Sequence, residues 1–157
     1  MIEVDPNAFQ FTQILHEYID PMHRLTFYKV GDQIAAEETT CRIFERAWED
    51  FERFKETNGR PRIWLYRLAL DTINREGSHQ DGSTAFSDRI PFGKGVDNTK
   101  LTRAILALPS VEQDLVILHE VEGLSDEDVS EITGLPLSWA KFAETLAKNR
   151  LLELLEQ

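Results

Sequence analysis

The sequence has a single cysteine, no long apolar run and a shortage of basic residues. Cys41 is the one cysteine among 157 residues, so the chain forms no internal disulfide and we expect a cytoplasmic location. No stretch approaches the roughly 20 apolar residues of a membrane-spanning helix, so we expect no membrane partner. The acidic start of the chain also lacks the apolar run of a signal peptide.

The excess of acidic over basic residues argues against some classes of binding function. The chain has 17 basic and 28 acidic residues, which gives a net charge of −11. Such an excess of acid argues against non-specific binding to nucleic acid or to anionic membranes, because both favour basic surfaces. A local basic patch remains compatible with this composition.

The sequence also lacks the motifs of an enzyme or a metalloprotein. No serine–histidine–aspartate set, glycine-rich phosphate loop or pair of catalytic carboxylates stands out, so we expect no enzymatic activity and no cofactor. The four histidines (His16, His23, His79 and His119) are dispersed, and none forms a pair with Cys41 at the spacing of metal ligands. The sequence therefore predicts no metal site.

What the sequence does contain is helical periodicity. Apolar residues recur at three- and four-residue spacing, which predicts helices at about 7–29, 34–55, 62–75, 100–107, 111–121, 125–133 and 137–155. Residues 78–99 have little to bury, and their glycine, serine and proline content is typical of a linker. We therefore expect an all-α fold in which two small helical domains, residues 1–77 and 100–157, are joined by the linker 78–99.

A helix-turn-helix signature lies in the second domain. Ser125 is suited to be an N-cap because its hydroxyl can accept a backbone N–H, and Asp128 occupies the position of a capping-box acid. Gly134 can adopt the positive φ that ends a helix, and Pro136 precedes the next helix. Such a pair usually places its second helix in a DNA major groove. Residues 100–157, however, hold five basic and eleven acidic residues, the reverse of a phosphate-binding surface.

Two blocks of sequence carry a resemblance to a known family. Residues 59–69 read Gly-Arg-Pro-Arg-Ile-Trp-Leu-Tyr-Arg-Leu-Ala, which is similar to a helix in region 2 of bacterial sigma factors. Residues 116–125 read Val-Ile-Leu-His-Glu-Val-Glu-Gly-Leu-Ser, which is similar to region 4. Because both blocks occur in the expected order, the chain resembles an extracytoplasmic-function (ECF) sigma factor of the sigma-70 family.

The resemblance implies a role in promoter recognition, with no catalytic chemistry in the sigma subunit itself. The partners that it implies are RNA polymerase core, promoter DNA and an anti-sigma factor. The first domain would bind polymerase and capture a flipped base of the minus-10 element, and the second would place its last helix at the minus-35 element. The family pattern assigns polymerase contacts to Glu38, Cys41, Arg42 and Glu45. It assigns DNA contacts to Arg62, Arg67, Arg75, Ser138, Lys141, Lys148 and Arg150.

The chain departs from the family pattern at several contact positions. Family members usually have a Gln-Glu pair where they contact polymerase. This chain has Cys41-Arg42 at these positions, so a positive charge replaces a negative one. Asp71 replaces a usual Asn in the third helix, and Ala143 replaces a usual Arg in the last helix. These departures leave a second interpretation open, a sigma-fold decoy that binds an anti-sigma factor without reading DNA. A third and weaker interpretation is one half of a split sigma factor.

The aromatic residues help to distinguish a DNA-reading sigma factor from a decoy. We expect four of them to lie in the core rather than to stack on bases: Phe44, Trp48, Trp64 and Tyr66. Trp139 and Phe142 occupy base-reading positions of the last helix, where bulky apolar residues are unusual. We expect both to be buried against the preceding helices, and the alternative is a protein-binding surface.

Overall fold

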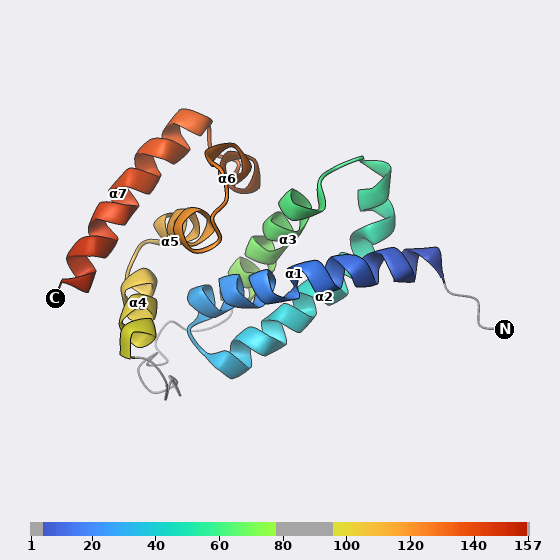
Figure 1. Cartoon of the computed structure of the whole chain (residues 1–157), viewed down its shortest axis with the longest axis horizontal. Helices are drawn as coiled ribbons and strands as arrows, with labels where there is room; N and C mark the ends of the chain where they lie inside the picture. Colours follow the sequence, from blue (N-terminus) through green and yellow to red (C-terminus); the bar gives the residue numbers. More distant parts are fainter. Residues whose placement is uncertain (1–4, 78–95, 157) are drawn as a thin grey trace.

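The computed structural model describes residues 5–77 and 96–156, and these two ranges are built from helices (Figure 1). The N-terminal half contains α1 (Pro6–Val30), α2 (Gln33–Glu56) and α3 (Pro61–Gly77). The C-terminal half contains α4 (Val96–Leu106), α5 (Ser110–Val116), the π-helical segment η2 (Ile117–Val121), α6 (Asp126–Thr133) and α7 (Leu137–Leu155). The predicted all-α fold class is confirmed for the described residues. None of the described helices combines the length and the apolar character that crossing a bilayer requires.

The helix boundaries follow from local capping chemistry. The carboxylate of Asp32 accepts the N–H of Ala35 at the start of α2, and the hydroxyl of Ser125 accepts the N–H of Asp128 at the start of α6. Helix α1 ends at Gly31 and helix α6 ends at Gly134, both with the positive φ that glycine adopts without a steric penalty. These breaks are local, which is why the sequence predicted them.

Two predicted boundaries differ from the structure. Most of the predicted linker, residues 78–95, lies outside the described residues, and α4 begins at Val96 rather than near residue 100. The helix predicted at 111–121 is a short α-helix that widens into η2 after Val116. The N–H of Glu122 bonds the carbonyl of Ile117 at 2.8 Å, a five-residue step that belongs to a π-helix.

Both halves contribute to one apolar core. Helices α1, α2 and α3 pack on one another, and α1 also contacts α4 and η2 while α3 contacts α6. Fully buried side chains come from both halves: Met22, Leu25, Ile43, Leu65, Ile105, Leu115, Ile117 and Leu118. Helix α7 packs on α4, α5 and α6 and lies at the outer edge of the molecule, away from α3 (Figure 1).

The polar contact at the centre of this junction is the carboxylate of Glu122, whose side chain is fully buried. Arg24 of α1 donates from Nη2 to Oε1 at 3.0 Å, and the hydroxyl of Tyr66 in α3 donates to the same oxygen at 2.6 Å. Burial raises the pKa of Tyr66, and its hydrogen bond to Glu122 raises it further, so the phenol remains a donor. One residue of the C-terminal half is therefore held by two helices of the N-terminal half.

A second buried pair joins α1 to α5. The ammonium of Lys29 lies 2.8 Å from Oδ1 of Asp114, and the two side chains are only 4% and 14% exposed. Lys29 also donates to Ser110 and Gln113, at 3.1 and 3.0 Å. Because desolvation offsets much of the attraction in a buried pair, we assign this contact to the orientation of α5 rather than to net stability.

Candidate functional site

A hollow of about 850 Å³ lies beside the turn between α2 and α3. Residues 57–60 form part of its wall, and Asn58 in this turn has a φ of 55°. The rings of Phe54 and Trp64 also line it and stack, with centroids 4.1 Å apart and an interplanar angle of 9°. Its charged lining is Arg46, Arg53, Arg60, Arg67 and Arg75, with Asp50, Asp71 and Glu131. The acidic chain thus carries a local basic surface.

The structure places the predicted DNA-binding residues of α3 on two sides of the helix. Arg67 and Arg75 line the hollow, and Nε of Arg75 lies 3.1 Å from Oδ2 of Asp71. Arg62 is exposed outside the hollow, with Nη1 3.7 Å from Oδ2 of Asp128 in α6. The structure therefore brings Arg67 and Arg75 together and directs Arg62 toward the C-terminal half.

Asp128 was predicted to be a capping-box acid, but its carboxylate instead contacts two arginines of the N-terminal half. Its backbone N–H is capped by the hydroxyl of Ser125 at 3.1 Å. Its carboxylate, only 10% exposed, accepts a hydrogen bond from Arg60 and lies near Arg62. A residue that reads as a local capping acid thus joins α6 to the start of α3.

On α7 the predicted DNA-binding residues do not form a continuous positive strip. Ser138 and Lys141 are exposed on the outer surface of the helix. The ammonium of Lys148 lies 3.4 Å from Oε1 of Glu120, and Nη1 of Arg150 lies 3.1 Å from Oε2 of Glu112. Two of the three predicted cations on this helix are therefore paired with carboxylates of the same half.

The prediction that Trp139 and Phe142 are buried is wrong. Trp139 is 51% exposed and Phe142 is 62% exposed, and their rings stack with centroids 5.8 Å apart. The buried face of α7 consists of Ala140, Ala143, Ala147 and Leu151, at three- and four-residue spacing. Each aromatic residue precedes a buried alanine by one position, a rotation of about 100°, and therefore points away from the core.

The predicted polymerase-binding residues share the exposed side of α2. Glu38, Cys41, Arg42 and Glu45 are all exposed. Nη2 of Arg42 donates to Oε2 of Glu76 at 3.1 Å, and the hydroxyl of Thr39 donates to the same oxygen at 2.7 Å. The charge reversal at Arg42 is thus compensated within the chain by a carboxylate near the end of α3.

An apolar hollow of about 400 Å³ adjoins this side of α2. It is lined by Leu15, Ile19, Thr40, Cys41, Phe44, Glu45 and Trp48. Phe44 and Tyr66 are buried and Trp64 is partly buried, whereas Trp48 is 44% exposed, so the expected core position is wrong for Trp48. Trp48 lies seven residues, about two helical turns, after Cys41, and this spacing is the sequence signal that it shares the exposed side.

The sequence did not predict which carboxylates pair with the arginines of the candidate sites. Glu76 and Asp128 are distant in sequence from their arginine partners, and Glu122 is 98 residues from Arg24. Propensity and periodicity describe neighbours along the chain, so neither could reveal these pairs. The excess of acidic residues was the one signal that cations would be neutralised internally.

Two curated relatives of this chain are ECF sigma factors. No family model matches the chain. The chain is 26% identical to the ECF RNA polymerase sigma factor SigW of Bacillus subtilis, over 83% of this chain and 81% of the relative. It is 24% identical to the ECF RNA polymerase sigma factor SigE of Mycolicibacterium smegmatis, over 80% of this chain and 53% of the relative.

Two solved structures share the fold. The sigma factor RpoE from Bartonella quintana, in complex with the anti-sigma factor NepR, matches with a TM-score of 0.78 and 20% identity, over 94% of this chain and 97% of RpoE. CnrH, in complex with the cytosolic domain of CnrY, matches with a TM-score of 0.72 and 14% identity, over 96% of this chain and 90% of CnrH. At these identities the similarity establishes a shared fold.

The contact between Arg42 and Glu76 predicts a pH-dependent contribution to stability. Burial acts to raise the pKa of Glu76, but hydrogen bonds from Arg42 and Thr39 outweigh it and lower that pKa below about 4.5. A carboxyl whose pKa falls on folding stabilises the protein above its unfolded pKa, and this contribution is lost as pH falls through the folded value. Glu76→Gln should therefore lower the free energy of unfolding at pH 7 by about 0.5 to 1 kcal/mol, since the pair is partly solvated.

Urea unfolding of both proteins at pH 7 and at pH values below 4.5 measures this difference. We expect this difference to shrink with acidification and to be absent in Glu49→Gln, which changes an exposed glutamate of α2. A difference that stays constant across this pH range would contradict the assignment.

Proposed function

Because the chain belongs to the extracytoplasmic-function branch of the sigma-70 family, we propose that it is a sigma factor that directs RNA polymerase core to promoters. Its relatives are sigma factors, which contribute recognition to transcription initiation and are not enzymes. We propose that the N-terminal half is a region 2-like domain and the C-terminal half a region 4-like domain. Action together with polymerase would place the protein in the cytoplasm.

The observation that carries this proposal is the arginine-lined hollow beside the turn between α2 and α3. Guanidinium groups neutralise phosphates, and they also offer planar faces on which an unstacked base can lie. The aromatic pair of Phe54 and Trp64 adds an apolar wall to the same hollow. A basic hollow with an aromatic wall suits single-stranded promoter DNA with an extruded base.

The exposed side of α2 supports binding to core polymerase. Glu38 and Glu45 keep the acidic character that the family uses against polymerase, and both are exposed. Since Glu76 neutralises Arg42, the departure at this position does not present an isolated positive charge to polymerase. The departure from the family pattern is therefore compatible with docking.

Promoter binding through Arg62 has to compete with an internal contact. Arg60 and Arg62 meet the carboxylate of Asp128, which belongs to the other half of the molecule. A DNA phosphate can replace this carboxylate only when α6 moves away from the start of α3. We therefore propose that promoter recognition requires the two halves to separate at this contact.

Arg67→Ala tests the hollow as a DNA-binding surface. Arg67 is exposed and lines the hollow, so its removal should weaken promoter binding by the polymerase complex to a similar extent across sequences. The slope of log affinity against log salt should become shallower by about 1, which corresponds to the loss of one phosphate contact. Fluorescence anisotropy of a labelled promoter fragment at several salt concentrations gives both values.

Lys100→Ala is the matched control, because Lys100 is an exposed cation on α4 that does not line the hollow. It should leave affinity and slope unchanged. The proposal itself fails if the wild-type chain does not bind core polymerase under conditions in which an established ECF factor binds it. Core-dependent transcription from a cognate promoter provides the positive readout.

A decoy that binds an anti-sigma factor without reading DNA is the second candidate function, and the outer face of α7 favours it. Trp139 and Phe142 form a stacked, exposed aromatic pair where a DNA-reading helix usually presents polar groups. Aromatic anchors of this kind are typical of protein-binding hot spots. The solved RpoE structure contains an anti-sigma factor, and we propose a partner of the same class for this chain.

The double variant Trp139→Ala/Phe142→Ala separates the two functions. A decoy should lose at least tenfold in affinity for its cognate anti-sigma factor, since each exposed anchor would be truncated. Leu152→Ala is the control, because Leu152 is 50% exposed on the same helix beyond the aromatic pair. Isothermal titration calorimetry measures these affinities. A wild-type promoter affinity that falls steeply with added salt would contradict the decoy.

A further inference from the structure

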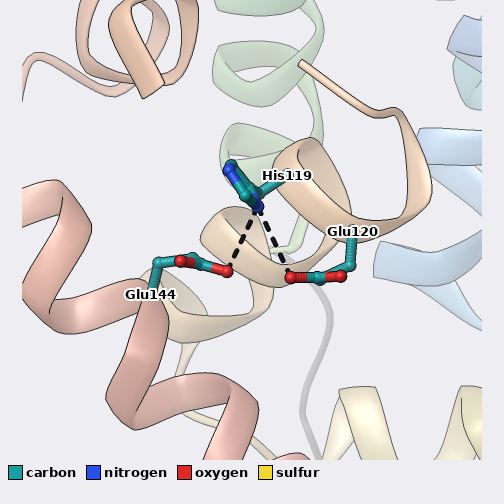
Figure 2. A group of neighbouring side chains, drawn as sticks. All are labelled: His119, Glu120 and Glu144. Atoms are coloured by element: carbon teal, nitrogen blue, oxygen red, sulfur yellow. Dashed lines mark hydrogen bonds and ion pairs between the residues drawn. The ribbon is translucent and has the colours of Figure 1, made fainter. Parts of the chain in front are cut away.

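Three side chains outside the proposed polymerase and DNA surfaces converge at the boundary between η2 and α7. Figure 2 shows His119 and Glu120 from η2 and Glu144 from α7 pointing toward one another. Nδ1 of His119 lies 3.4 Å from Oε1 of Glu120 and 3.2 Å from Oε1 of Glu144. One donor atom from each residue lies within 4.8 Å of the other two. The group therefore has one imidazole and two carboxylate donors around a single point.

Asp126 determines which nitrogen of His119 faces this point. Oδ1 of Asp126, in the first turn of α6, lies 3.1 Å from Nε2 of His119 on the other side of the ring. A carboxylate accepts a hydrogen bond, so Asp126 can hold the tautomer that carries its proton on Nε2, in which Nδ1 presents its lone pair to the other two residues. This arrangement of a carboxylate behind a histidine is the one that orients histidine ligands in metal sites.

We propose that His119, Glu120 and Glu144 form a binding site for a divalent transition metal ion of the Zn²⁺ class. Bonds of about 2.0 to 2.1 Å in tetrahedral geometry place neighbouring donors about 3.3 Å apart. The two separations from Nδ1, 3.2 and 3.4 Å, match this value. The imidazole donor selects Zn²⁺ over Mg²⁺ and Ca²⁺, which prefer oxygen ligands alone.

The electrostatics around the group favour a cation. The carboxylates of Glu120 and Glu144 face the same point, and two carboxylates this close repel one another when both are ionised. A metal ion between them removes this repulsion. The three side chains are 15% to 34% exposed, which leaves room for water as a fourth ligand.

Lys148 is the one described cation placed to compete for this position. Its ammonium lies 3.4 Å from the same Oε1 of Glu120, and its side chain is 52% exposed. The long side chain can therefore leave Glu120 for solvent when a metal ion binds. Metal binding would connect η2 to α7 and release a lysine that lies on the proposed DNA-binding helix.

Titration of Zn²⁺ into the full chain, in competition with a chromophoric chelator, tests the site. The titration uses a Cys41→Ser background, so that the exposed thiol does not contribute. We expect one equivalent to bind, and His119→Ala and Glu144→Gln should each lower the affinity at least tenfold. Asp126→Asn should lower it less, because it leaves all three ligands in place. His16→Ala, an exposed histidine on α1, is the control and should bind as the parent does.

Lys148→Ala gives a readout that a purely structural role for these residues would not produce. Removal of the competing ammonium should tighten Zn²⁺ binding several-fold, and Zn²⁺ should raise the melting temperature of this variant and of the parent but not of Glu144→Gln. The proposal is overturned if one-to-one binding is absent, if His119→Ala or Glu144→Gln binds like the parent, or if Lys148→Ala weakens binding. Mg²⁺ at the same concentration should leave the melting temperatures unchanged.

Discussion

The buried carboxylate of Glu122 is the contact on which the arrangement of this molecule depends. It lies immediately before Gly123 at the end of η2, and it receives donors from Arg24 in α1 and Tyr66 in α3. A buried carboxylate that loses its donors costs several kcal/mol, so the C-terminal half cannot leave the N-terminal half until water reaches this group. The same junction brings α6 to α3 and so places Asp128 against Arg60 and Arg62. The carboxylate of Glu122 therefore helps to set the position of the helix-turn-helix, together with the apolar core that both halves share.

Carboxylates of the chain already neutralise most of the cations that were predicted to bind DNA. Among the described cations predicted to bind DNA, Arg62, Arg75, Lys148 and Arg150 have carboxylates within ion-pair distance. Arg67 and Lys141 are the exposed members of this set for which the described residues show no such ion pair. Partners that bring phosphates or new carboxylates therefore compete with the protein's own acids. Under the proposed function, the pair of Arg62 with Asp128 would make separation of the two halves part of DNA recognition, because this pair joins α3 to α6.

Local structure could be predicted from the sequence because its causes are local. The N-caps at Asp32 and Ser125 and the left-handed glycines Gly31 and Gly134 belong to signals a few residues long. The widening into η2 has no such signal, and it merged into the predicted helix at 111–121. The errors at Trp139 and Phe142 are different, since the stripe from Ala140 to Leu151 was visible at helical spacing and indicated the buried face.

The candidate sites depend on contacts between distant residues, and these could not be predicted. His119 and Glu120 are adjacent, but Glu144 joins them only because α7 packs on α5 and α6, the helices on either side of η2. Likewise, the compensation of Arg42 by Glu76 depends on the packing of α2 against α3. The resemblance to sigma factors identified the positions of contact residues, whereas only the structure shows which of them are already occupied by internal partners.

The central claim is that the free protein holds its two halves together through Glu122, and a distance measurement between the halves tests it most directly. One nitroxide label is attached to the native Cys41, which is exposed on α2, and a second to E153C, an exposed position of α7. Pulsed electron–electron double resonance then measures the distance between the two labels in the full chain. We predict one narrow distance distribution that agrees with the structure, and a longer, broad distribution in Glu122→Ala. A broad distribution in the wild-type chain, or a narrow one that Glu122→Ala leaves unchanged, would contradict the claim.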